Sequence, residues 1–99
     1  MRDLKDAFRF LKDVLPLDLP VRLRRRELKD CYGAASLVQH KNGERSFLIE
    51  IDKKLTEPMV RWVLIHEYAH CRSWAAEDED HGPLWGQAYA EVYRELFPD

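Results

Sequence analysis

The chain has 99 residues, of which 45% are hydrophobic and 34% charged, the length and composition of one small globular domain. This composition excludes collagen-like, low-complexity and disordered chains, and no run approaches the about 18 uninterrupted apolar residues of a membrane span. The net charge of −2 is uneven, because residues 1–54 carry 13 Lys/Arg against 9 Asp/Glu and residues 55–99 carry 3 against 9.

The N-terminal segment predicts an amphipathic helix over residues 3–14. Leu4, Phe8, Leu11 and Leu15 recur at helical spacing, and the prolines that follow end the helix. Charges run through the first fifteen residues, which therefore lack the apolar core of a secretory signal. We expect a cytoplasmic protein.

Three extended segments follow, at residues 21–29, 32–40 and 45–52. The Asn42-Gly43 pair predicts a two-residue type I′ hairpin between the last two, because this turn needs positive φ at both central positions. Pairing outward from such a turn would give one apolar face. The expected opposite pairs are Val38 with Phe47, Ser36 with Ile49, and Ala34 with Ile51.

Two helices complete the chain. Thr56 is the expected N-cap of a helix that runs to about Ala76, and an acidic loop over residues 77–80 leads to a last helix over residues 83–96. The order α–β–β–β–α–α predicts an α+β fold. We expect a single domain over residues 1–99, with a small three-stranded antiparallel sheet packed on about three helices.

The helix after Thr56 is apolar almost all round, which predicts a buried central helix. His66, Glu67 and His70 nevertheless share one arc of about 100° on it. Ionisable groups clustered on a central helix are destabilising unless something pairs them, and a metal ion is the simplest partner. Two core histidines satisfied by hydrogen bonds are the alternative interpretation.

The string His66-Glu67-Tyr68-Ala69-His70 is an HExxH motif. Histidines at i and i+4 point the same way and can hold one zinc ion, while Glu67 is rotated toward a water on the metal. A catalytic zinc usually takes a third protein ligand. His81, eleven residues after His70 and followed by Gly-Pro, is favoured over Glu91 on the last helix, and the acids at 77–80 are further candidates.

With these residues in view, the chain resembles the SprT-like zinc metallopeptidases, whose wider relatives include the Spartan proteases that digest DNA–protein crosslinks. The likeness is greatest to short phage- and bacterium-encoded members and covers about residues 20–97. It rests on the stretches Cys31-Tyr32-Gly33, Ile49-Glu50-Ile51-Asp52, Leu64 to His70, and Asp80 to Arg94.

The resemblance implies a minimal zincin-like core that binds one Zn²⁺ through His66, His70 and His81, with Glu67 as the catalytic base. The implied reaction is hydrolysis of peptide bonds in flexible or unfolded protein segments. Spartan-type proteins add DNA-binding regions or a zinc ribbon, and this chain has neither. The alternative function is a zinc-stabilised protein- or DNA-interaction module without peptidase activity.

Three further expectations concern the surroundings of the site. Tyr89 is a candidate second donor to the oxyanion, although a plain core tyrosine is the commoner role. Asp80 is a candidate partner that orients a ligand histidine. An extended peptide could add to a sheet edge, for which residues 45–51 are the candidate strand.

The sequence says less about binding partners and about the redox state of the two cysteines. A basic cluster could contact DNA phosphates weakly, although a solvated edge strand is the commoner reading of such a run. This cluster consists of Arg22, Arg24, Arg25, Arg26 and Lys29. Two cysteines in a chain without an export signal predict reduced thiols, at least one of them buried.

Overall fold

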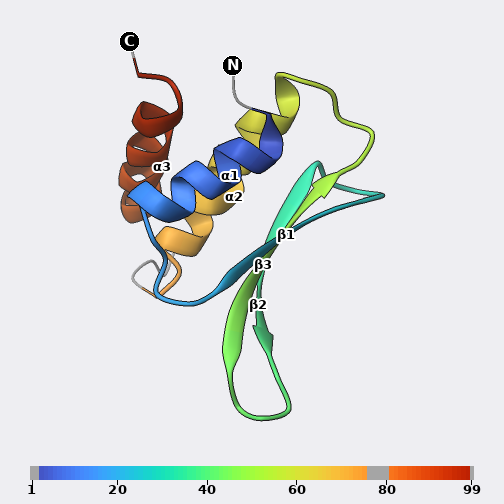
Figure 1. Cartoon of the computed structure of the whole chain (residues 1–99), viewed down its shortest axis with the longest axis vertical. Helices are drawn as coiled ribbons and strands as arrows, with labels where there is room; N and C mark the ends of the chain where they lie inside the picture. The colour runs from blue at the N-terminus through green and yellow to red at the C-terminus, as the bar shows by residue number, and fades with distance from the viewer. Residues whose placement is uncertain (1–2, 76–80, 99) are drawn as a thin grey trace.

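The structure is a computed structural model that describes residues 3–75 and 81–98, and these residues form three helices and three strands. The elements in chain order are α1 (Leu4–Val14), β1 (Val21–Arg26), β2 (Gly33–Gln39), β3 (Arg45–Asp52), α2 (Met59–Arg72) and α3 (Pro83–Leu96). Figure 1 shows the helices gathered on one side of a curved sheet, with the β2–β3 hairpin reaching beyond them. The predicted α+β class and element order are confirmed.

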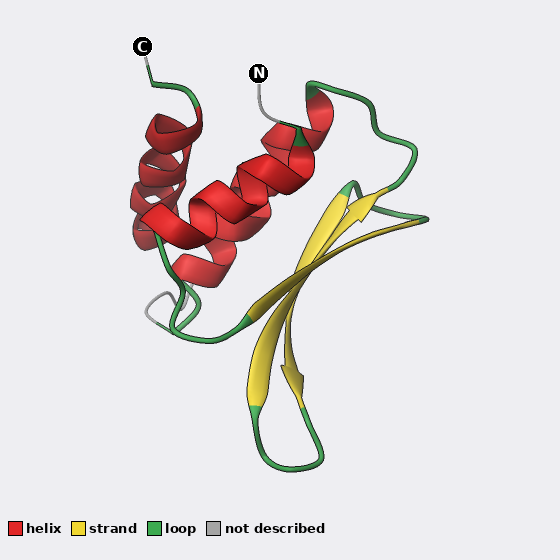
Figure 2. Ribbon diagram, viewed as in Figure 1, coloured by secondary structure: helices red, strands yellow, loops and turns green. Residues whose placement is uncertain are grey.

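The sheet is mixed, so the prediction of an antiparallel sheet is wrong for β1. The strand order is β1-β3-β2, with β3 parallel to β1 and antiparallel to β2 (Figure 2). The chain leaves a gap between β1 and β2, and β3 returns into it from the hairpin. Because β1 and β2 run in opposite directions, a strand between them that is antiparallel to β2 is parallel to β1.

The apolar composition of β3 is that of a central strand. This central position contradicts the prediction that residues 45–51 form the sheet edge to which a peptide substrate adds. Phe47, Ile49 and Ile51 are buried, as expected for a strand with neighbours on both sides. Residues 45–51 therefore have no free edge, since β1 and β2 occupy both sides. The strands at the edges of this sheet are β1 and β2.

The hairpin register differs by one residue from the prediction. Phe47 lies opposite Leu37, Ile49 opposite Ala35 and Ile51 opposite Gly33. Among the described non-glycine residues Asn42 does not have positive φ, whereas Gly43 has φ 90°, so a type I′ turn is not formed. The observed three-residue loop is closed by the His40 N–H, which donates to the Glu44 carbonyl at 2.8 Å.

The helix boundaries follow from capping and from proline. Asp3 caps α1 by accepting a hydrogen bond from the Asp6 N–H at 2.8 Å. In contrast, Thr56 does not cap α2, which begins at Met59 after Pro58. A residue before proline is disfavoured in helical backbone, so Glu57 blocks the earlier start.

Helix α2 also ends before the predicted residue 76. A turn follows Arg72, and the Ser73 hydroxyl donates to the Ala69 carbonyl at 3.0 Å. Most of α2 is buried as predicted, with Leu64, Ile65 and Tyr68 completely so, but Met59 and Trp62 in its first half are exposed. No helix in residues 3–75 and 81–98 has the length and apolarity needed to cross a bilayer.

The core lies between the sheet and the helices. Within it, a buried tyrosine on α2 is hydrogen-bonded to the C-terminal end of α1. The one proton of the Tyr68 hydroxyl is shared between the carbonyls of Leu15 and Leu11, at 2.7 and 3.2 Å. A buried hydroxyl without such acceptors would be costly. These bonds hold the HExxH turn of α2 in place from its buried side, opposite the histidines.

Candidate metal centre

Two elements bring three imidazoles together. His66 and His70 are one turn apart on α2, and His81 lies just before Gly82, the N-cap residue of α3. Their ring centroids lie 4.8–4.9 Å apart. His81 has φ 61°, in the left-handed region that few non-glycine residues adopt. Gly82 caps α3 in extended backbone and Pro83 opens it, so this short turn aims His81 at α2.

The three Nε2 atoms converge on one point. They lie 3.2 Å apart for His70 and His66, 3.1 Å for His70 and His81, and 3.0 Å for His81 and His66. A ring nitrogen either carries a proton and donates or is bare and accepts. Three mutually adjacent nitrogens therefore cannot form three hydrogen bonds at once. A cation that all three lone pairs face resolves this conflict.

The spacing and the donor set fit a small divalent ion. Nitrogens held about 2.0–2.1 Å from one ion at tetrahedral angles lie about 3.3–3.4 Å apart, only slightly more than observed. Neutral imidazole is the commonest side-chain metal ligand in proteins. The triad His66, His70 and His81 could thus hold a metal ion, and the half-exposed His66 and exposed His81 leave one side open.

Glu67 lies beside the triad and outside it. Its carboxylate Oε2 is 4.0 Å from Nε2 of His66, and its side chain is 9% exposed. This distance is longer than the about 3.3–3.4 Å between two ligand atoms on one tetrahedral zinc ion, and Glu67 is not among the residues grouped as possible metal ligands. Its role as a base stays a prediction.

Trp85 on α3 closes one side of the triad, a role that the sequence reasoning missed. Its ring centroid lies 5.1 Å from that of His66, 5.5 Å from His70 and 4.6 Å from His81. The indole N–H also donates to the His66 carbonyl at 3.4 Å. Trp85 follows His81 by four residues, but His81 lies before α3 and has positive φ, so helical spacing alone does not predict this contact.

Gly33 is the second residue that the sequence reasoning left without a role. A Cβ on it would lie 2.4 Å from Cγ1 of Val63 and 3.2 Å from both the Glu67 carboxylate and the Glu50 carbonyl. Only glycine lets β2 approach α2 this closely. Its position in the Cys31-Tyr32-Gly33 stretch was noted, but a close approach cannot be deduced from sequence alone.

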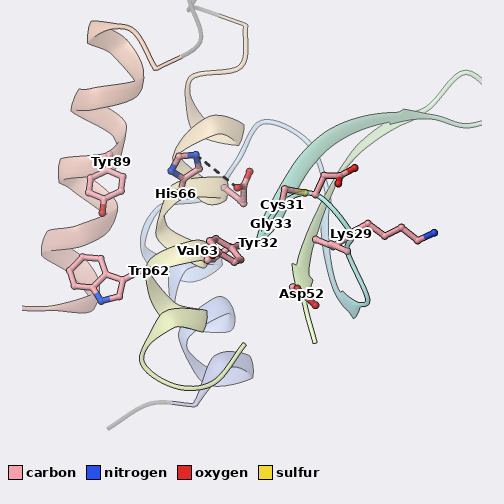
Figure 3. Close-up of a pocket in the computed structure, with 12 residues that line it drawn as sticks. Lys29, Cys31, Tyr32, Gly33, Asp52, Trp62, Val63, His66 and Tyr89 are labelled. Carbon is pink, nitrogen blue, oxygen red and sulfur yellow. Dashed lines mark ion pairs between the residues drawn. The ribbon is translucent and has the colours of Figure 1, made fainter. Parts of the chain in front are cut away.

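A cavity of about 730 Å³ opens over this part of α2. Figure 3 shows Trp62 and Tyr89 on the α3 side, and Cys31, Tyr32 and Gly33 on the side of the sheet. His66 and Glu67 line the same cavity between these walls. We call this cavity the cleft.

The remaining predicted residues have different outcomes. Tyr89 lines the cleft, and its ring centroid is 5.2 Å from that of Trp85. Burial, and to a smaller extent the neighbouring Tyr93, raises the pKa of the Tyr89 hydroxyl above its ordinary value. Tyr89 therefore keeps its proton and can donate it to a hydrogen bond. Glu91 is not in the triad and pairs with Arg72 at 3.6 Å. Asp80 and the acids at 77–79 lie outside the described residues.

The basic strand β1 is largely committed to the fold. Arg24 and Arg26 both pair with the Glu50 carboxylate, at 2.7 and 3.2 Å. Arg25 donates to the carbonyls of Asp52 and Leu55, at 3.1 and 3.0 Å. Contact with DNA through this strand would compete with these bonds.

Both cysteines are free, with Cys31 exposed and Cys71 buried, as predicted for reduced thiols.

Comparisons of the chain with family models, with curated proteins and with solved structures find no match.

Proposed function

We propose that this chain is a zinc-dependent metalloendopeptidase with a minimal zincin-like core of the SprT-like type. The observation that carries the proposal is the convergence of His66, His70 and His81 with Glu67 4.0 Å from His66 at the edge of a cleft. Three protein ligands with an open side are typical of catalytic zinc, whereas structural zinc usually has four, rich in cysteine. This difference favours an enzyme over a zinc-stabilised interaction module.

In the proposed reaction Zn²⁺, when bound, supplies a water of pKa about 7 and polarises the scissile carbonyl. Glu67 accepts the proton of the attacking water and then donates it to the leaving amine. Its carboxylate is buried next to Gly33 and lines the cleft, which shields it from bulk solvent during both transfers. Tyr89, protonated at neutral pH, is the candidate donor to the oxyanion from the opposite wall.

The substrate would be an extended protein segment. We propose that it adds to the free edge of β2, which replaces the strand expected from the sequence. Helix α2 packs against β2, and a Cβ on Gly33 at the start of that strand would lie 3.2 Å from the Glu67 carboxylate. Backbone hydrogen bonds along a strand edge give affinity without strong sequence selectivity.

The test is hydrolysis of an unfolded protein by the zinc-loaded wild type and by Glu67→Gln. This substitution keeps the size of the side chain and removes its basicity, so we expect one zinc per chain with turnover lower by at least about 100-fold. Retained hydrolysis in Glu67→Gln would refute the role of Glu67. A wild type that holds zinc and cleaves no substrate would instead favour the interaction module.

A further inference from the structure

One exposed aromatic group borders the cleft and has no part in the proposed chemistry. Trp62 lies one helical turn before His66 on α2 and lines the same cavity as His66 and Glu67. It is 39% exposed. Figure 3 shows it next to α3, on the same side of the cleft as Tyr89.

The indole of Trp62 is held by its neighbours. It stacks on Tyr93 with a centroid distance of 5.6 Å and an interplanar angle of 29°, and on Phe97 at 5.4 Å and 21°. Tyr93 and Phe97 are themselves 5.2 Å apart. A side chain stacked on two others loses little further freedom when a ligand covers it, so Trp62 is a preorganised apolar surface.

We propose that Trp62 is a specificity-determining residue, which selects protein segments with an aromatic or large aliphatic side chain within two residues of the scissile bond. The inference rests on the proposed peptidase function. One helical turn separates Trp62 from His66 by about 6 Å. Every second residue of an extended peptide is separated by about 6–7 Å. A segment that lies along α2 and is cleaved at the triad therefore presents to Trp62 a side chain two residues away from the one beside His66.

The charge around this surface favours a peptide over a nucleic acid strand. Asp30, Asp52 and Glu67 line the same cavity as Trp62, against the single basic side chain of Lys29. A stacking surface for nucleic acid bases normally lies in a basic groove that tracks the phosphates. An apolar peptide side chain avoids this repulsion and gains by covering the exposed indole.

The experiment compares zinc-loaded wild type, Trp62→Ala and Trp62→Phe on matched quenched peptides. The peptides differ only by Phe, Leu, Gly or Glu at one of the two positions on either side of the scissile bond. We expect kcat/KM of the wild type to be about tenfold higher for Phe or Leu than for Gly at one such position. Trp62→Ala should lose this preference, and Trp62→Phe should keep most of it.

Trp74→Ala is the matched control. Trp74 is also 39% exposed, does not line the cleft, and packs on Phe47 at a centroid distance of 5.5 Å. Removing Trp74 tests the general effect of losing a surface tryptophan, and the peptide preference of Trp74→Ala should equal that of the wild type. Circular dichroism establishes whether Trp62→Ala is folded, and Trp62→Gln, which keeps more of the side-chain volume without the ring, replaces it in both assays if it is not.

Binding separates failure of this inference from failure of the proposed function. Anisotropy of the same labelled peptides on zinc-loaded Glu67→Gln should show the preference for Phe and Leu, and its loss in Glu67→Gln/Trp62→Ala. Cleavage with the same preference in wild type and Trp62→Ala, or an equal loss for all peptides, would overturn the role of Trp62. Absence of cleavage with selective binding would overturn the peptidase function alone.

Discussion

Gly33→Ala should both destabilise the fold and impair turnover, because the new methyl group has no space. Its Cβ would lie 2.4 Å from Cγ1 of Val63, a branched side chain with little rotamer freedom, and 3.2 Å from the Glu50 carbonyl. Overpacking of this kind typically costs about 1–3 kcal/mol. For a domain of this size each kcal/mol lowers the Tm by about 4–8 °C.

The same methyl group would lie 3.2 Å from the Glu67 carboxylate, closer than an ordinary contact. If β2 and α2 move apart to accommodate it, Glu67 shifts relative to the triad. A misplacement of about 1 Å can cost about 100-fold in rate. We therefore expect Gly33→Ala to keep its zinc and to lose activity by about 10- to 100-fold.

The assay is thermal unfolding together with hydrolysis of an unfolded protein. Gly86→Ala is the control, because a Cβ on this helical glycine meets nothing within 4 Å, and alanine there should stabilise α3 by about 0.5–1 kcal/mol. Gly33→Ala/Val63→Ala should recover part of the Tm, since the 2.4 Å contact is gone. A Gly33→Ala protein as stable and active as the wild type would refute the close approach.

Three further predictions concern other parts of the fold. The hydrogen bond from Arg24, together with the nearby charge of Arg26, holds the pKa of Glu50 below its ordinary 4.5. The ion pair therefore contributes stability at pH values above 4.5 that is lost as the pH falls through the lowered pKa. Glu50→Gln should remove this dependence at a cost of less than about 1 kcal/mol, measured by urea unfolding at pH 7 and pH 3. Burial raises the pKa of Cys71 to about 12, so a thiol reagent at pH 8 should modify one cysteine in the folded protein and two in urea; rapid reaction of two in the folded protein would contradict this burial. Tyr68→Phe should cost about 1–2 kcal/mol by removing the donor to two carbonyls, and an unchanged Tm would show that these bonds contribute nothing.

The sequence predicted the parts of the fold that depend on local patterns. Helical spacing located α1 and α3, and the apolar surround of the HExxH motif predicted a buried α2. The parallel pairing of β1 with β3 was missed because strand order depends on contacts between distant segments. The hairpin register was missed because Asn-Gly fits both a two-residue loop and a three-residue loop in which only Gly43 has positive φ.

The candidate site was predictable where spacing alone determines position. His66, Glu67 and His70 follow from helix geometry, and the Gly-Pro after His81 favoured a return of the chain to α2. Trp85 and Gly33 were not assigned roles because their contacts join α3 and β2 to α2 across the fold. Glu91 was an alternative third ligand in the sequence, but the structure groups His81 and not Glu91 with His66 and His70, and Glu91 pairs with Arg72.

The measurement that tests the central claim most directly is zinc per chain, by elemental analysis of untagged wild type, His81→Ala and Glu91→Ala. The triad predicts one zinc in wild type and in Glu91→Ala, and loss or marked weakening in His81→Ala. Zinc retained in His81→Ala but lost in Glu91→Ala would contradict the ligand set. No zinc in the wild type after reconstitution would contradict the metal centre itself.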